Sequence, residues 1–206
     1  MLTVHVLPLG PLQTNVWLVA DEDGEAVVID PAWDGPGILE AAQRRGWRIG
    51  QVWCTHAHFD HIGGVPDLMR AINPAPLLAL HADDGPLWAA QGGAALFGFS
   101  LPPLPLPSLA LRHQQRLSLG PYTFEVRHTP GHTAGHCVFY CAAAGLCFCG
   151  DLIFRHGVGR SDLPGGDEER LIQSIRSQIF TLPAETRLLP GHGPETTVKE
   201  EQHVTI

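Results

Sequence analysis

The sequence contains no apolar run near the roughly 20 residues that a membrane-spanning helix requires, and no run of lysine or arginine. Charged residues make up only 17% of the chain, and the formal net charge is -8. Residues 1–5 carry neither the basic nor the apolar stretch of an export signal. Because proteins that bind a phosphate backbone normally present a basic patch, we expect a cytoplasmic protein whose partner is neither a membrane nor a nucleic acid.

The cysteines number only five, and an odd count argues against a disulfide framework. All of them lie in or beside apolar segments that are typical of strands: Cys54, Cys137, Cys141, Cys147 and Cys149. Cys147 and Cys149 are two residues apart and would share one face of a strand. We expect all the cysteines to be buried, reduced thiols.

What the chain does have is an ordinary globular composition, with 44% apolar residues over 206 residues. This length supports one sizeable core and no linker divides it, so we expect a single domain over 1–206. Apolar, β-branched patterns predict strands at 4–9, 16–20, 26–30, 49–54, 77–80, 122–127, 137–140, 146–149 and 187–189. Helices are predicted at 38–45, 62–71, 83–91 and 168–180. Because strands come in runs and helices punctuate both halves, an α+β protein with two sheets and helices outside them fits best.

Residues 92–108 are the irregular part, rich first in glycine and then in proline. The stretch Leu101–Pro107 must be extended, because proline fixes φ and restricts the residue before it. We interpret this stretch as a surface crossover or as a lid over a site. A ligand for a proline-recognising module is the alternative, but no basic residue flanks the stretch.

The most informative stretch is Thr55–Gly64, in which three histidines and one aspartate occur within six residues. His56 and His58 are two apart at the end of a predicted strand, so both imidazoles can point to one side. Asp60 and His61 follow where the next helix begins, a position at which an aspartate alone would be an ordinary helix cap. Neutral imidazoles and a carboxylate are ligands for zinc, iron or manganese, and four so close could hold two ions.

Three further candidates, His132, Asp151 and His192, stand at turns that follow predicted strands, each beside glycine or proline. Functional groups are often built at such strand ends, and glycine lets the backbone approach an ion closely. Taken singly, each could be a turn histidine or a capping aspartate. Together with the first cluster they supply five histidines and two aspartates, the right number for two neighbouring ions with open positions for water.

In its order this set resembles the metallo-β-lactamase superfamily, with an HxHxDH signature at His56–His61 and then His132, Asp151 and His192. The resemblance covers nearly the whole chain and implies a four-layer αβ/βα sandwich, with two mixed β-sheets and the site along one edge. It also implies two divalent metal ions, with zinc first and iron or manganese as alternatives. The implied ligands are His56, His58 and His132 for one ion, Asp60, His61 and His192 for the other, and Asp151 for both.

Within that superfamily the chain resembles the glyoxalase II branch, whose members are hydroxyacylglutathione hydrolases. The motifs are Pro130–Thr133, Gly150–Phe154 and Pro190–Gly193, while Gly159–Asp167 resembles the short bacterial members. The resemblance implies a thioesterase that cleaves S-D-lactoylglutathione-like esters by a metal-bridging hydroxide. Asp60 would then ligate one metal and orient the nucleophile.

Full-length glyoxalase II enzymes carry a C-terminal helical region that contributes to glutathione binding, and we expect no counterpart of it here, because the sequence has only 14 residues after His192. Recognition of a glutathione-type thiol ester is therefore expected from Arg160 and Ser161, or from residues 92–107. Arg160 could pair with a substrate carboxylate or, equally, with Asp162.

Other functions stay open at this point. A persulfide dioxygenase would keep much of the motif, but it would use one iron bound by two histidines and one aspartate and would consume oxygen. A nuclease is opposed by the net charge, and a non-catalytic scaffold by the presence of all seven candidate ligands. Asp60 directly before His61, with no export signal, argues against an antibiotic-degrading lactamase.

Among the remaining histidines, His136 is a candidate partner for a metal ligand, or simply a strand residue, because it lies four residues after His132. The others are expected in surface or structural roles: His5, His81, His113, His128, His156 and His203. The five tryptophans are expected as core or rim aromatics.

Overall fold

The strand at residues 14–20 shows how the chain builds its layers, because its side chains alternate between two apolar cores. In a computed structural model, which describes residues 1–202, Trp17 and Val19 point into one core and Val16 and Leu18 into another. A strand that is apolar on both faces must be covered on both. This sheet therefore packs against a second sheet on one side and against helices on the other.

The first sheet belongs to the N-terminal half of the chain. That half contains β1 (Thr3–Leu9), β2 (Thr14–Ala20), β3 (Glu25–Ile29), α1 (Gly35–Gln43), β4 (Arg48–Trp53), α2 (Phe59–Ile62), α3 (Val65–Ala71), β5 (Leu77–His81), η1 (Ala82–Asp84), α4 (Gly85–Ala89), η2 (Gln91–Phe97) and β6 (Leu109–Leu111). The strand order is β1-β2-β3-β4-β5-β6. The sheet is mixed, because β1 to β3 pair antiparallel and β3 to β6 pair parallel.

The second sheet belongs to the C-terminal half. That half contains β7 (Arg116–Leu119), β8 (Tyr122–His128), β9 (Cys137–Cys141), η3 (Ala142–Ala144), β10 (Leu146–Gly150), β11 (Ile153–Phe154), β12 (Gly157–Val158), α5 (Glu168–Ser174), η4 (Ile175–Ile179), β13 (Arg187–Pro190), β14 (Thr196–Thr197) and α6 (Val198–Glu201). The strand order is β14-β13-β10-β9-β8-β7, and β10 pairs with β13 in parallel while the other pairs are antiparallel. Strands β11 and β12 form a separate small hairpin.

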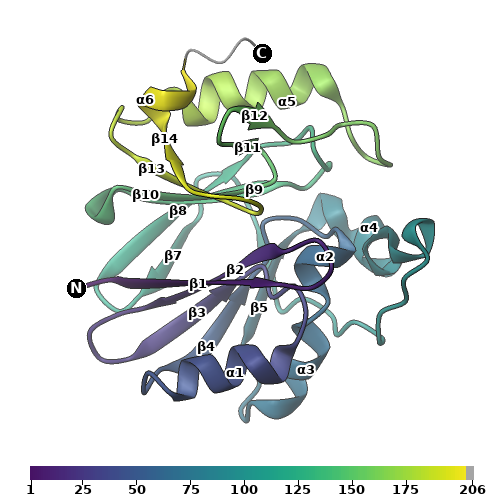
Figure 1. Ribbon diagram of the computed structural model, residues 1–206, viewed down its shortest axis with the longest axis vertical. Coiled ribbons are helices and arrows are strands. Elements are labelled where there is room, and N and C mark those ends of the chain that lie inside the picture. The colour runs from purple at the N-terminus through teal and green to yellow at the C-terminus, as the bar shows by residue number, and fades with distance from the viewer. Residues whose placement is uncertain (203–206) are drawn as a thin grey trace.

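The central core lies between the two sheets. There the ring of Trp53 on β4 contacts the rings of Phe124 on β8 and Phe139 on β9, with centroids 5.1 and 5.3 Å apart. Helices α1 and α3 cover the outer face of the first sheet, and α5 covers the outer face of the second (Figure 1). The expected four-layer αβ/βα sandwich with two mixed sheets is confirmed.

Three predicted helices differ from those in the structure. The helix predicted at 62–71 is interrupted at Gly63 and Gly64, so that α2 begins earlier, at Phe59, and α3 forms a second helix. The helical hydrogen bonds stop there because the N–H of Gly64 donates to the carbonyl of Pro31 at 2.8 Å and Pro66 has no N–H to donate. The helix predicted at 83–91 is divided into η1 and α4, and the one at 168–180 into α5 and the π-helical η4.

The elements that the sequence pattern did not reveal are short, such as β6, β7, β11, β12 and β14. The proline stretch 101–107 forms no helix or strand, as predicted. All five cysteines are free and buried, which confirms that prediction. Within residues 1–202 no helix combines the length and the hydropathy needed to cross a membrane, and His203 lies outside the described residues.

Candidate metal centre

The strands bring the candidate ligands to one edge of the sandwich, where β4, β8, β10 and β13 end. His56 and His58 follow β4, His132 follows β8, Asp151 follows β10 and His192 follows β13. Helix α2 begins directly after His58 and supplies the two remaining candidates, which are buried on its single turn. All seven predicted residues are therefore gathered at one place.

Main-chain hydrogen bonds tie the two sheets together at this edge. The N–H of Cys137 donates to the carbonyl of Thr55, and the N–H of Asn15 donates to the carbonyl of Gly191, both at 2.7 Å. These bonds connect the segments that carry the candidate ligands to the strands of the opposite sheet. The site is consequently held by the rigid part of the fold, which favours a fixed ligand geometry.

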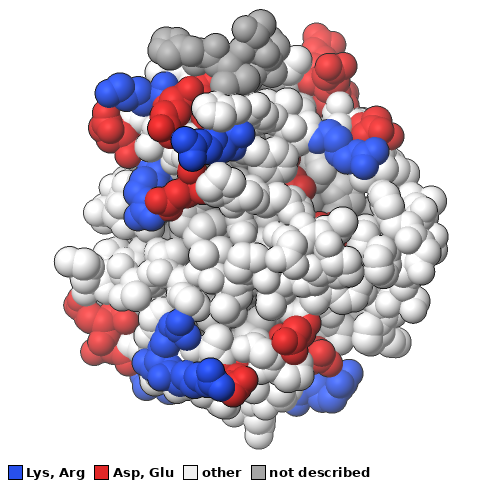
Figure 2. All heavy atoms as spheres, in the orientation of Figure 1, with Lys and Arg blue, Asp and Glu red and all other residues white. Residues whose placement is uncertain are grey.

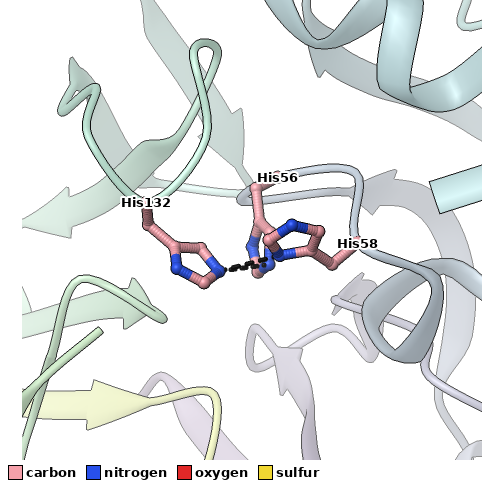
Figure 3. A group of neighbouring side chains, drawn as sticks. All are labelled: His56, His58 and His132. Carbon is pink, nitrogen blue, oxygen red and sulfur yellow. Dashed lines mark hydrogen bonds between the residues drawn. The ribbon is translucent and has the colours of Figure 1, made fainter. Parts of the chain in front are cut away.

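His56, His58 and His132 form a tight group of buried rings, hereafter the first triad (Figure 3). The Nε2 atom of His132 lies 2.8 Å from Nδ1 of His58 and 3.2 Å from Nε2 of His56. Figure 3 shows these nitrogens turned toward one another from three separate rings. Nitrogens that bind one ion tetrahedrally at about 2.0–2.1 Å lie roughly 3.3 Å apart, so this arrangement is already close to that of a metal site.

Asp60, His61 and His192 form a second group, hereafter the second triad. The Oδ2 atom of Asp60 lies 3.3 Å from Nε2 of His192 and 3.6 Å from Nε2 of His61. The hydroxyl of Thr14 donates to the same oxygen at 3.1 Å. Nδ1–H of His192 donates to the carbonyl of Leu12 at 3.1 Å, which turns Nε2 of that ring toward the site.

Asp151 lies between the two triads and reaches both. Its Oδ2 atom is 3.8 Å from Nε2 of His132 and 3.5 Å from Nε2 of His192. Its Oδ1 atom is 3.3 Å from Nε2 of His61. A carboxylate placed in this way can contribute one oxygen to each of two neighbouring cations.

Two buried atoms at the centre of this cluster, Nε2 of His61 and Oδ1 of Asp151, have no hydrogen-bond partner among the described residues. Leaving a buried polar atom unpaired costs on the order of 1–3 kcal/mol. A cation between the triads would satisfy both atoms and would suit a donor set of imidazoles and carboxylates. The His/Asp cluster thus fits a dinuclear metal site.

The pKa shifts agree with a site that attracts cations. Burial lowers the pKa of His61, but the carboxylates of Asp151 and Asp60 outweigh it and raise that pKa well above its usual value. Burial raises the pKa of Asp151, but His61 outweighs it and holds that pKa far below its usual value. Burial is the main cause that lowers the pKa of His56 and of His132, so both rings are neutral at pH 7, as metal ligands must be.

Asp30, buried just after β3, orients one ring of each triad. Its Oδ2 atom accepts hydrogen bonds from Nδ1–H of His61 at 3.0 Å and from the Thr55 hydroxyl at 2.6 Å, and its Oδ1 accepts from the Thr55 N–H at 2.7 Å. The Thr55 oxygen in turn lies 2.9 Å from Nδ1 of His56 and can accept its proton. A proton held on each Nδ1 leaves Nε2 as the atom of each ring that can bind a metal, which displaces the second proton of His61.

Asp84, at the end of η1, ties together the two loops that carry the first triad. Its Oδ2 atom accepts hydrogen bonds from the Ala57 N–H and the Thr133 hydroxyl, both at 2.9 Å, and its Oδ1 accepts from the Gly135 N–H at 2.6 Å. Asp30 and Asp84 were not among the residues predicted from the sequence. The only available signal was the position of Asp30 as the lone carboxylate at the end of an apolar strand.

The two residues predicted to bind substrate, Arg160 and Ser161, differ in their relation to the cavity over the triads. The Nε and Nη2 atoms of Arg160 lie 2.7 and 2.8 Å from the two carboxylate oxygens of Asp162, so the pairing within the chain is the one present. The carbonyl of Arg160 accepts a hydrogen bond from Nδ1–H of His132 at 2.7 Å and so orients a candidate ligand. Arg160 lines the cavity over the triads, whereas Ser161 is not among the residues that line it.

His136 is buried beside His56, with ring centroids 5.2 Å apart, and its Nδ1 lies 2.8 Å from the hydroxyl of Thr129. Its Nε2 atom has no hydrogen-bond partner among the described residues, so it does not orient a candidate ligand through a hydrogen bond. His81 and His128 stack with centroids 4.0 Å apart and an angle of 10°. Parallel rings direct their lone pairs in parallel planes, and this pair therefore does not converge on a cation.

A cavity of about 330 Å³ opens over the two triads. It is lined by Leu12, His58, Phe59, Asp60, Phe97, Phe99, His132, Asp151, Arg160, Leu163 and His192. The polar part of this lining consists of candidate ligands and Arg160. The rest is apolar.

We expect Gly191→Ala to lower both metal content and activity, because a Cβ at this position would lie 2.1 Å from Oδ1 of Asp151 and 2.6 Å from Cε1 of His61. Both side chains would have to shift by about 1 Å, a displacement that can reduce activity by about a hundredfold. Metal per chain, measured by mass spectrometry, and hydrolysis rate check this expectation. Gly157→Ala is the matched control, since a Cβ there would meet nothing within 4 Å. Equal loss of metal and activity in both variants would show that the close approach of Gly191 to Asp151 and His61 does not matter.

A four-layer sandwich that gathers five histidines and two aspartates at one edge defines a class of metal-dependent hydrolases. Residues 9–192 match the family model described as the metallo-beta-lactamase superfamily, and the chain belongs to that superfamily.

Several similar curated proteins are named as hydrolases. The chain is 36% identical over 200 residues to the probable metallo-hydrolase YqgX of Bacillus subtilis, covering 95% of this chain and 92% of the relative. It is 29% identical over 202 residues to the hydroxyacylglutathione hydrolase GloC of Haemophilus influenzae, covering 98% and 95%. A hydroxyacylglutathione hydrolase of Albidiferax ferrireducens is 34% identical over 193 residues, but the match covers 92% of this chain and only 66% of that longer relative.

Solved structures with the same fold include a metallo-beta-lactamase and a protein in a di-iron-bound form. BLEG-1, a B3 metallo-beta-lactamase, superimposes with a TM-score of 0.91 at 34% identity, covering 98% of each chain. TTHA1623 in a di-iron-bound form gives 0.90 at 40% identity, again covering 98% of each. ETHE1 from Myxococcus xanthus gives 0.81 at 25% identity, covering 98% of this chain and 82% of the other.

Proposed function

We propose that this protein is a metal-dependent thioesterase that hydrolyses S-2-hydroxyacylglutathione esters such as S-D-lactoylglutathione. The observation that carries the proposal is the position of Asp151, whose two carboxylate oxygens face both complete triads. Similarity to the Haemophilus hydroxyacylglutathione hydrolase over nearly the full length of both chains supports the substrate class. Similarity to a protein crystallised in a di-iron-bound form supports a two-metal centre.

The proposed ligands are the first triad for one ion, the second triad for the other, and Asp151 for both. Zinc is the first candidate, with iron and manganese as alternatives that the same donor set would accept. Two such ions, when bound, supply a water activated near pH 7 and a Lewis acid for the carbonyl group.

The chain's own residues position the reactants. The Thr14 hydroxyl donates to Asp60 Oδ2 and fixes that carboxylate beside His192, where it can accept a proton from the attacking water and orient it. The apolar side of the cavity shields the carbonyl from bulk solvent. The thiolate that leaves has a parent pKa of about 8.5 and needs little help from a general acid, which explains why a site with few groups beyond its ligands suffices.

The test is steady-state hydrolysis of S-D-lactoylglutathione by protein whose metal content per chain has been measured. We expect turnover with about two metals per chain, loss of turnover after removal of metal by a chelator, and recovery when zinc, iron or manganese is added back. Circular dichroism of the chelated protein serves as the control for folding.

A persulfide dioxygenase is the second candidate, because the chain superimposes on ETHE1 with a TM-score of 0.81. One iron per chain and oxygen uptake with glutathione persulfide, without thioester hydrolysis, would replace the proposed function with that one. Hydrolysis of a cephalosporin without thioester hydrolysis would instead favour a lactamase, as similarity to BLEG-1 allows.

A further inference from the structure

One side of the cavity over the triads is an aromatic and aliphatic wall, hereafter the apolar wall, formed by Leu12, Phe59, Phe97 and Phe99. The ring of Phe59 lies 5.2 Å from that of Phe97 and 5.3 Å from that of Phe99, centroid to centroid. Leu12 is 48% and Phe97 43% exposed, although both are large apolar side chains. Exposed apolar groups that gather at the mouth of a polar centre mark a binding surface.

The wall is built on an uncharged part of the chain. Residues 85–111 contain no aspartate, glutamate, lysine, arginine or histidine, and this stretch supplies both Phe97 and Phe99. Figure 2 shows the charged side chains of this face mainly above and below its middle, while the side that carries α2 and α4 in Figure 1 is largely white. A charged group on a ligand would therefore find no partner along this wall.

The wall is also fixed in place. Phe99 packs against Trp33, with ring centroids 5.8 Å apart, as well as against Phe59. Gly92, at a φ of 66°, brings η2 so close to α2 that an added Cβ would lie 2.3 Å from the main-chain nitrogen of Phe59. A preformed apolar surface binds an apolar group without first having to order itself.

Outside the wall, the cavity is lined by candidate ligands, Arg160 and Leu163. Within residues 1–202, Arg160 is the only cationic residue besides histidine that lines the cavity over the triads. Its guanidinium group already donates two hydrogen bonds to the carboxylate of Asp162. The wall adjoins the second triad, because the Leu12 carbonyl accepts from His192, whereas Arg160 adjoins the first triad through His132. A thioester carbonyl held between the triads would thus have one neighbour that is apolar and one whose charge is already paired.

We propose that the apolar wall is the subsite for the acyl group, so that the enzyme prefers aromatic or branched 2-hydroxyacyl thioesters to the small lactoyl ester. This inference rests on the proposed thioesterase function and specifies the acyl group that it takes. A phenyl ring in place of the methyl group would bind more tightly, because it would bury apolar surface against Phe97 and Leu12 that is otherwise exposed to water. The selectivity is expected to be on the order of tenfold in kcat/KM.

The test compares S-D-mandeloylglutathione with S-D-lactoylglutathione on metal-loaded protein, because the two share thiol and hydroxyl and differ only in phenyl against methyl. We expect kcat/KM to be about tenfold higher for the mandeloyl ester. In Phe97→Ala we expect the ratio of the two values to fall toward one. Leu96→Ala is the matched control: Leu96 is 67% exposed on the same η2 segment but does not line the cavity, so its ratio should equal that of the unaltered protein.

A binding measurement tests this subsite independently of the proposed thioesterase function. Calorimetric titration of metal-loaded protein with D-mandelate and with D-lactate needs no turnover, and we expect mandelate to bind more tightly except in Phe97→Ala. Equal affinities, or a preference that survives Phe97→Ala, would overturn the subsite even if both thioesters are hydrolysed. Absence of any thioester hydrolysis would overturn the proposed function, and the mandelate-to-lactate affinity ratio would then decide the subsite by itself.

Discussion

Asp151→Asn is expected to reduce bound metal from about two ions to fewer than one per chain, and to reduce hydrolysis by about a thousandfold or more. The physical reason is that Asp151 faces both triads, with its oxygens 3.3 to 3.8 Å from Nε2 of His61, His132 and His192. An asparagine of the same shape keeps one oxygen but replaces the other with an NH₂ group, which cannot bind a cation. It also removes the negative charge that offsets two divalent ions.

Metal per chain by mass spectrometry and kcat/KM on the same preparation check this expectation. Asp67→Asn is the control, because it makes the same chemical change on a side chain that is 40% exposed on α3 and paired with Arg70. If Asp151→Asn kept two metals, Asp151 would not be the shared ligand, and each triad would have to hold its ion independently.

The layers of the fold were predictable because they follow from local patterns. Strand β2 alternates Trp17 and Val19 with Val16 and Leu18, and these pairs enter two different cores. Such alternation is visible in the sequence before any tertiary contact is known. The split between α2 and α3 was not predictable, because it depends on a tertiary hydrogen bond from the Gly64 N–H to the carbonyl of Pro31.

The seven candidate ligands could also be identified from the sequence, because each lies either in one short motif or at a predicted strand end beside glycine or proline. That the structure brings them together supports their proposed role as ligands. The supporting residues were not accessible in the same way. Asp84 looks like an ordinary surface aspartate until the fold places the N–H groups of Ala57 and Gly135 against it. The apolar wall needs Phe59 on α2 to meet Phe97 on η2, which is distant in the sequence.

The second large effect is expected from Asp30→Asn, which should weaken metal binding ten- to a hundredfold although Asp30 is not a proposed ligand. Asp30 accepts three hydrogen bonds, from the N–H and the hydroxyl of Thr55 and from Nδ1–H of His61. An asparagine that still accepts from the Thr55 N–H must turn its NH₂ toward the other two groups. His61 would then carry its proton on Nε2, and Thr55 would donate to His56, so each triad would lose a free Nε2.

Asp84→Asn separates this tautomer effect from a general loss of stability. Asp84 is equally buried and also accepts three hydrogen bonds, but from two main-chain N–H groups and a hydroxyl rather than from an imidazole. Both variants leave buried donors unpaired, so the metal-free proteins should each lose about 1–3 kcal/mol of unfolding free energy in urea. Only Asp30→Asn should shift the imidazole nitrogen resonances of His56 and His61 to the opposite tautomer and release metal to a weaker chelator from both triads. Equal metal loss in the two variants, with unchanged tautomers, would mean that Asp30 acts through stability alone.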